Sequence, residues 1–81
     1  MQPEEIKHLI EQGLPGSYVE VSGDGRHFEA VVVFRGFTGK SRIAQHRMVY
    51  AALGDRFATD TLHALALETF IPEQWEQAGG G

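Results

Sequence analysis

Hydrophobic residues change their spacing several times along the chain, and each change predicts a new element. Ile6, Leu9 and Ile10 stand three and four positions apart, which is the spacing of one face of a helix. Pro3 suits the first helical position, and Gly13 suits the residue just beyond the last turn. The pattern therefore predicts a helix that begins at Pro3 and stops at Gly13.

Two β-strands are predicted next. Residues 17–22 alternate between polar and apolar side chains, with Val19 and Val21 on one face. Residues 27–35 follow as a second strand, in which the stretch Ala30–Phe34 is almost wholly apolar. Such a run is typical of a central strand that is buried on both faces.

The second half of the chain predicts a helix, a strand and a further helix. The stretch Lys40–Leu53 has helical propensity and Ser41 as its N-cap, but its apolar residues surround the helix and indicate no single buried face. The stretch Leu62–Phe70 is predicted as a third strand. Pro72 then opens a final helix, in which Trp75 is expected to fold back onto the core.

The connections between the strands decide the predicted topology. Asp24-Gly25 predicts a hairpin with a two-residue turn, because glycine adopts positive φ without a steric penalty. A helical crossover, with a short turn of helix over residues 55–58, joins the second and third strands and favours their parallel pairing. The sequence therefore predicts an α+β fold in the order α-β-β-α-α-β-α, with a three-stranded mixed sheet.

Size and charge limit the classes of function. The 81 residues, 42% of them apolar, predict a single domain over residues 1–78 and a flexible glycine tail at 79–81. Eleven acidic and seven basic residues leave a net charge of −4, the wrong sign for a domain held to nucleic acid mainly by phosphate contacts. The sequence shows neither a signal-peptide pattern nor an apolar run long enough to span a membrane.

Missing residue types narrow the chemistry further. The chain has no cysteine, so it can offer neither a nucleophilic thiolate nor a thiolate ligand. It also lacks a Gly-x-Ser-x-Gly nucleophile elbow, a P-loop and a His-Glu-x-x-His metal motif. We therefore expect a protein that is not an enzyme, and a cytoplasmic location, with which the absence of cysteine is consistent.

Three segments together carry a resemblance to a known family. VSGDGRHF at residues 21–28, FRGFTGKSRIAQHRMVY at 34–50 and LHALALETFIPEQW at 62–75 occur in this order. Over residues 3–77 the chain resembles the BolA-like proteins, most closely their IbaG branch. The resemblance implies the BolA fold, which is similar to the second type of KH domain and agrees with the predicted order of elements.

The resemblance also implies a function. BolA-like proteins form heterodimers with monothiol glutaredoxins and share a [2Fe–2S] cluster with them, which implies an adaptor in iron–sulfur cluster trafficking or iron homeostasis. Thiolates of the glutaredoxin, and of glutathione supplied through it, would hold the cluster together with histidine from this chain. The family's ligand at the start of the last strand corresponds to His63, and a second candidate in the first hairpin corresponds to His27. Imidazole can replace thiolate on one iron of such a cluster.

The two histidines and the basic stretch of the chain each allow a second interpretation. From the residues alone, His63 and His27 fit at least as well as ordinary residues at strand ends. The resemblance also permits a DNA-binding transcriptional regulator that uses the helix-turn-helix-like segment 41–58, although the acidic balance argues against it. Its candidate contacts are Lys40, Arg42, His46 and Arg47. An interaction module without metal and a homodimer are further alternatives. RNA binding through Gly36-Phe37-Thr38-Gly39 is not favoured, because this Gly-x-x-Gly pattern precedes the long helix instead of joining two helices.

Overall fold

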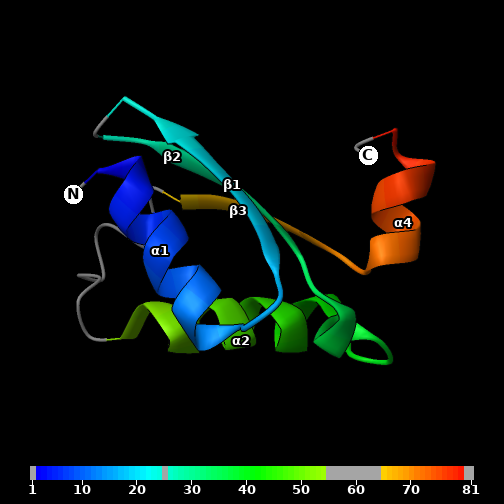
Figure 1. Cartoon of the computed structure of the whole chain (residues 1–81). Coiled ribbons are helices and arrows are strands. Elements are labelled where there is room, and N and C mark those ends of the chain that lie inside the picture. Colours follow the sequence, from blue (N-terminus) through cyan, green and yellow to red (C-terminus); the bar gives the residue numbers. More distant parts are fainter. Residues whose placement is uncertain (1, 25, 55–64, 80–81) are drawn as a thin grey trace.

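The computed structural model describes residues 2–24, 26–54 and 65–79 and confirms an α+β fold around a three-stranded sheet (Figure 1). The predicted helical turn at residues 55–58 and the first residues of the predicted third strand lie outside the described residues. The elements are α1 (Pro3–Gly13), β1 (Tyr18–Gly23), β2 (Phe28–Val33), a 3₁₀ turn (Arg35–Phe37), α2 (Arg42–Leu53), β3 (Leu65–Phe70) and α4 (Pro72–Gln77).

The sheet has the predicted topology, with β2 between its two neighbours. β1 pairs antiparallel with β2, and β3 pairs parallel with it, as the helical crossover requires. The prediction of a two-residue hairpin turn is wrong, because Gly23 pairs with Phe28 and leaves four residues, 24–27, in the loop. Asp24 also lacks the positive φ that a type I′ turn demands of its first central residue.

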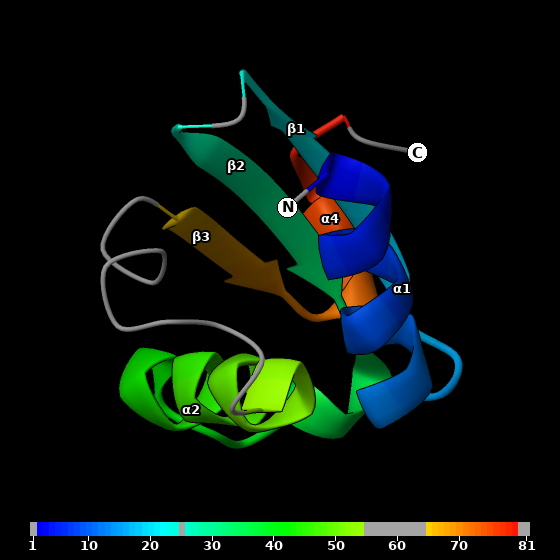
Figure 2. The same ribbon diagram turned by 90° about the vertical axis from the view of Figure 1, so that its left-hand side faces the viewer.

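One face of the sheet is covered by α1 and α2 and carries the core (Figure 2). Each strand turns alternate residues toward these helices, and the apolar ones among them are buried or half-buried. In β2 these residues are Phe28, Ala30 and Val32. The prediction that β2 is buried on both faces holds only at its end, where Val33 on the opposite face is also buried.

The packing of α1 against α2 corrects the expected role of Gly13. This glycine is the last residue of α1 rather than the residue beyond it, and its φ is not positive. A Cβ atom at Gly13 would collide with the Cβ of Ala52 on α2. The missing side chain therefore allows the two helices to approach closely, and the chain leaves the helix at Leu14.

The start of α2 is as predicted, with the Ser41 hydroxyl accepting the N–H of Ala44 at 3.2 Å. The buried side of this helix, which its sequence did not indicate, consists of Val49 and Leu53. Ile43, although apolar, is 66% exposed. Contacts with α1 and with β3, rather than the pattern of the helix itself, thus decide which side of α2 is buried.

The segment that joins β2 to α2 also contributes to the core. Phe37, at the end of the 3₁₀ turn, is fully buried, and its ring meets that of Phe34 edge to face at 5.3 Å between centroids. Gly39 follows with a φ of 78°, a conformation that L-residues other than glycine rarely adopt. The Gly-x-x-Gly stretch is therefore explained by the fold.

The second face of the sheet, called the open face here, is covered only at one end. The aligned residues Tyr18, Val33 and Phe70 form a row across this end, and Trp75 of α4 packs on it. The ring of Trp75 lies 5.3 Å from that of Phe70 and 6.0 Å from that of Tyr18. The expectation that Trp75 joins the core is wrong, because α4 approaches the open face and none of its residues is buried.

No helix among the described residues is long and apolar enough to cross a membrane.

Candidate functional site

The hairpin loop that carries His27 is held in place by one aspartate. Asp24 Oδ1 accepts the backbone N–H groups of Arg26 and His27, both at 2.9 Å. The N–H of Asp24 donates in turn to the C=O of His27 at 3.2 Å. Because the N–H groups of His27 and Arg26 stabilise the charged carboxylate, they hold the pKa of Asp24 below its ordinary value of 3.8. The backbone of His27 is thus anchored on both sides.

The imidazole of His27 is available for binding. His27 is exposed and is the last loop residue before β2 begins at Phe28. Because Phe28 lies opposite Leu65 in the parallel pair, the loop that ends at His27 and the first described residue of β3 share one end of the sheet. The predicted ligand His63 precedes Leu65 by two residues in the sequence and lies outside the described residues.

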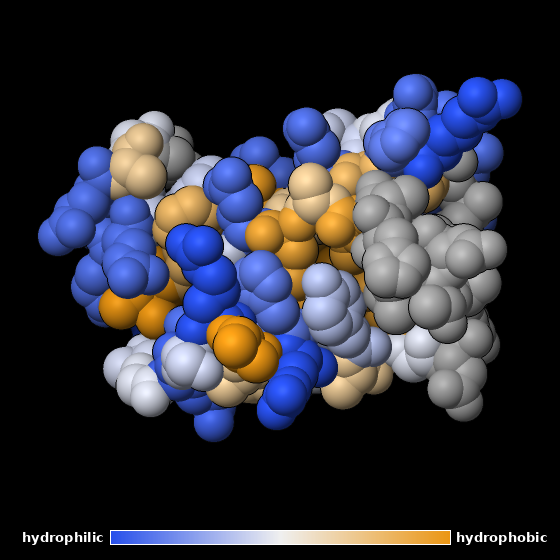
Figure 3. Space-filling model, turned by 180° about the vertical axis from the view of Figure 1, so that it is seen from behind, coloured by the Kyte–Doolittle hydropathy of each residue, from blue (hydrophilic) through white to orange (hydrophobic). Residues whose placement is uncertain are grey.

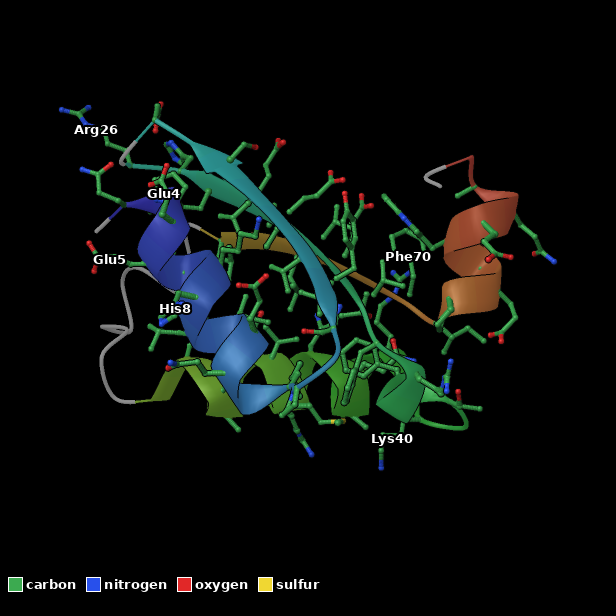
Figure 4. The ribbon with its side chains drawn as sticks, in the orientation of Figure 1. Glu4, Glu5, His8, Arg26, Lys40 and Phe70 are labelled. Carbon is green, nitrogen blue, oxygen red and sulfur yellow. The ribbon has the colours of Figure 1, made fainter. Side chains whose placement is uncertain are left out.

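The basic candidates Lys40 and Arg42 lie at the other end of the sheet from His27. Figure 4 shows Arg26 at the hairpin end, with Glu4, Glu5 and His8 of α1 on the same side of the molecule, and Lys40 far from them. The structure therefore separates His27 from Lys40 and Arg42, which lie near the last residues of β3.

The four basic candidates of the DNA-binding hypothesis do not share one surface. Lys40 and Arg42 both line a hollow of about 400 Å³ beside the end of β3, and both are exposed. Arg47 is also exposed, but it stands five positions after Arg42 and so points about 140° further round α2. Of the four candidates, the structure brings only Lys40 and Arg42 together on one surface.

His46, the remaining candidate, is half-buried. Burial lowers the pKa of its imidazole, and the guanidinium of Arg42 lowers that pKa further. Its Nε2 atom is shielded from water and has no hydrogen-bond partner among the described residues. The ring meets that of Tyr50 edge to face at 6.4 Å between centroids. A neutral, shielded imidazole is a poor contact for a phosphate group.

Sequence reasoning missed Gln45, which attaches the start of α2 to the rest of the fold. Its Nε2 donates to the C=O groups of Phe37 at 3.2 Å and of Lys40 at 3.0 Å. Its Oε1 accepts the hydroxyl of Thr69 in β3 at 2.6 Å. Nothing in the local pattern singles out this glutamine, because its partners are 5, 8 and 24 positions away.

The donor set limits what metal chemistry this chain can perform. The chain has no cysteine, and its described part contains no group of three or more His, Asp or Glu side chains that could hold a metal ion. An anchored, exposed imidazole fits a single ligand contributed to a centre whose other ligands come from elsewhere. The residues described here do not fit a metal centre held by this chain alone.

Comparison with known proteins identifies relatives across nearly the whole chain. The family model for BolA-like protein matches residues 7–74. The chain is 33% identical to the acid stress protein IbaG of Escherichia coli (strain K12), over 93% of this chain and 89% of that protein. It is 42% identical to the DNA-binding transcriptional regulator BolA of the same strain, over 68% of this chain and 51% of that protein.

Solved structures agree with these relationships. The structure of a bolA protein homologue from Coxiella burnetii superposes with a TM-score of 0.82 and is 44% identical in sequence. The match covers 94% of this chain and 97% of that one. The fold predicted from the sequence therefore has a close experimental counterpart.

Proposed function

Because this chain belongs to the BolA-like family, we propose that it is a non-enzymatic adaptor that binds a monothiol glutaredoxin. In the proposed heterodimer the chain contributes His63, and His27 as a second candidate, to a [2Fe–2S] cluster whose thiolates come from the glutaredoxin and glutathione. The proposed role is cluster trafficking or iron homeostasis in the cytoplasm.

One observation carries the proposal within the described residues. The parallel register sets the loop that ends at His27 beside the beginning of β3, the strand that follows His63 in the sequence. Asp24 holds the backbone of His27 while its imidazole stays exposed. An immobilised backbone and a free side chain are what a ligand offered to a partner requires, because less conformational entropy is lost on binding.

Anaerobic reconstitution tests this function directly. The protein, a monothiol glutaredoxin, glutathione, iron and sulfide are mixed, and visible absorption and circular dichroism are recorded. We expect a spectrum that differs from that of the glutaredoxin homodimer and that changes in His63→Ala, with a smaller change in His27→Ala. His8→Ala is the matched control, because His8 is an exposed histidine on α1.

Two other outcomes would replace the proposal. If the heterodimer forms but His63→Ala and His27→Ala have the same spectrum as the wild type, neither histidine is a cluster ligand. The chain would then be an interaction module without a metal role. If no heterodimer forms, glutaredoxin binding itself is excluded under those conditions. Size-exclusion chromatography of the same mixtures separates these two outcomes.

A DNA-binding regulator is the second candidate, favoured by the pair of exposed cations Lys40 and Arg42 at the end of β3. It requires duplex affinity that falls steeply with salt, because each phosphate contact releases counterions. We expect weak binding with a shallow salt dependence, since only two of the four candidate cations converge. A steep dependence that is lost in Lys40→Ala and Arg42→Ala would instead establish this function.

A further inference from the structure

The outer edge of β3 has no strand beside it among the described residues. β3 lies at the margin of the sheet, and its pairing with β2 includes a bond from the N–H of Phe34 to the C=O of Phe70, 3.0 Å long. In a parallel pair, alternate residues direct both backbone groups toward the neighbouring strand, and the residues between them direct theirs away. The residues of β3 that direct their N–H and C=O groups outward are Leu65, Leu67 and Thr69.

Within residues 2–24, 26–54 and 65–79, this edge shows none of the sequence features that usually block further pairing. Edge strands are commonly blocked by proline, by lysine or by a bulge. β3 contains neither residue, and its register with β2 is continuous over all six residues. Its one charged side chain, Glu68, belongs to the open face and also lines the hollow beside this edge, opposite Arg42.

A groove runs along the same edge. A hollow of about 550 Å³ is bounded by residues 66–70 on one side and by Arg42 on the other. It adjoins the hollow that Lys40 lines, because Arg42 belongs to both. Figure 3 shows this side of the molecule, with exposed apolar atoms in a band at its centre. The exposed Ile43 also belongs to α2 and stands next to Arg42 in sequence.

The chemistry of the groove favours a peptide over a nucleic acid. The edge offers N–H donors and C=O acceptors in alternation, and the backbone of an extended peptide supplies partners for both kinds at the matching spacing. A phosphodiester backbone offers acceptors and would leave the outward C=O groups without partners. Lys40 and Arg42, exposed at one end of the groove in a chain of net charge −4, are complementary to acidic side chains.

We propose that the outer edge of β3 and the adjoining side of α2 form a docking groove for an acidic, extended segment of a partner protein. The segment pairs with β3 as a fourth strand, and its carboxylates approach Lys40 and Arg42. This proposal is independent of the cluster-sharing function, because it uses neither His27 nor His63.

Titration of the full chain with short labelled peptides tests the proposal without any glutaredoxin. The probe alternates glutamate and valine. One control peptide alternates lysine and valine, and a second is the acidic peptide methylated at every backbone nitrogen, which cannot donate to a strand edge. We expect only the first to bind, and we expect Arg42→Glu to weaken it about fivefold, the scale of an exposed ion pair. Arg47→Glu, on another side of α2, is the matched control and should leave the affinity unchanged.

Amide hydrogen exchange locates the bound peptide within the same experiment. The outward N–H groups of Leu65, Leu67 and Thr69 should exchange more slowly when the peptide is bound. The inward N–H groups of Ala66, Glu68 and Phe70 already donate to β2 and should change little. The two sets alternate along one strand, so they control for a general change in stability.

Several results would overturn the proposal. They include no binding up to about 1 mM acidic peptide, equal binding of the methylated peptide, or protection of other residues. Tighter binding of an oligothymidylate at the same edge would assign the groove to single-stranded nucleic acid. Concentration-dependent self-association that protects the outward amides would assign it to a second copy of this chain.

Discussion

The two faces of the sheet differ in chemistry although the same three strands build both. The covered face turns Val19, Ala30 and Val32 toward α1 and α2, and all three are buried. The open face carries three glutamates, Glu20, Glu29 and Glu68, around the half-buried Val31. Only the row beneath Trp75 is apolar on this face. The difference indicates that the stability of the fold depends on the covered face, while the open face remains available for contacts.

Local interactions on the open face support this division. The hydroxyl of Tyr18 donates to the carboxylate of Glu20, two positions along β1. The pKa of Tyr18 is raised by this hydrogen bond, because the bond stabilises the protonated hydroxyl. Both residues are exposed, so the pair marks a solvated surface.

The largest expected effect compares two neighbouring valines of β2. Val32→Ala removes two buried methyl groups from the covered face and should lower the free energy of unfolding by about 2 kcal/mol. Val31→Ala acts on the half-buried open face and should lower it by less than about 1 kcal/mol. The loss of β-propensity is common to both, so the difference reports burial. Urea denaturation measures both values, and equal losses would contradict the division into two faces.

A smaller effect is expected where a polar contact attaches α2 to β3. Gln45→Ala removes the bonds to Thr69, Phe37 and Lys40 and should cost about 1–2 kcal/mol of unfolding free energy. Arg47→Ala, exposed on the same helix, is the control and should stay within about 0.5 kcal/mol of the wild type.

A double-mutant cycle sharpens this second prediction. If the Gln45–Thr69 bond is made in solution, Thr69→Val should cost less in the Gln45→Ala background than in the wild type. If the two losses of unfolding free energy are strictly additive, Gln45 and Thr69 act independently. Their hydrogen bond would then not be what attaches α2 to β3.

The smallest effect is a pH dependence of stability that arises from the half-buried imidazole of His46 in α2. Burial lowers the pKa of His46 in the folded chain below the ordinary 6.5, so between these two values the unfolded chain binds more protons. The contribution of His46 to stability is therefore intact above pH 6.5 and is lost as the pH falls through that window. His46→Gln should make the decline between pH 7 and pH 5 less steep, whereas His8→Gln on exposed α1 should not. Thermal melts across this range measure the slopes, and equal slopes in wild type and His46→Gln would contradict the assignment.

The predictable part of the fold rests on interactions between near neighbours in sequence. The Ser41 cap, the prolines that open α1 and α4, and the apolar run of β2 each carry their signal within a few residues. The parallel pairing of β3 follows from the length of the crossover. The hairpin is recognisable from the sequence, but its loop length is not, because Asp24 uses its side chain rather than a primed turn to close it.

The candidate site was predictable only in part. His27 could be named from the sequence, but its position beside the start of β3 required the parallel register. Gln45 and the groove along β3 carried no local signal, since each depends on residues far apart in the chain.

The sequence by itself determined the order of elements, the central place of β2 and the lack of thiolates in this chain. These properties depend on residue type and on spacings of two to four positions. Tertiary structure alone decided which side of α2 is buried, why Gly13 must lack a side chain, and on which face Trp75 packs. Each of these depends on the surface that another element presents, and no periodicity within one segment specifies that surface.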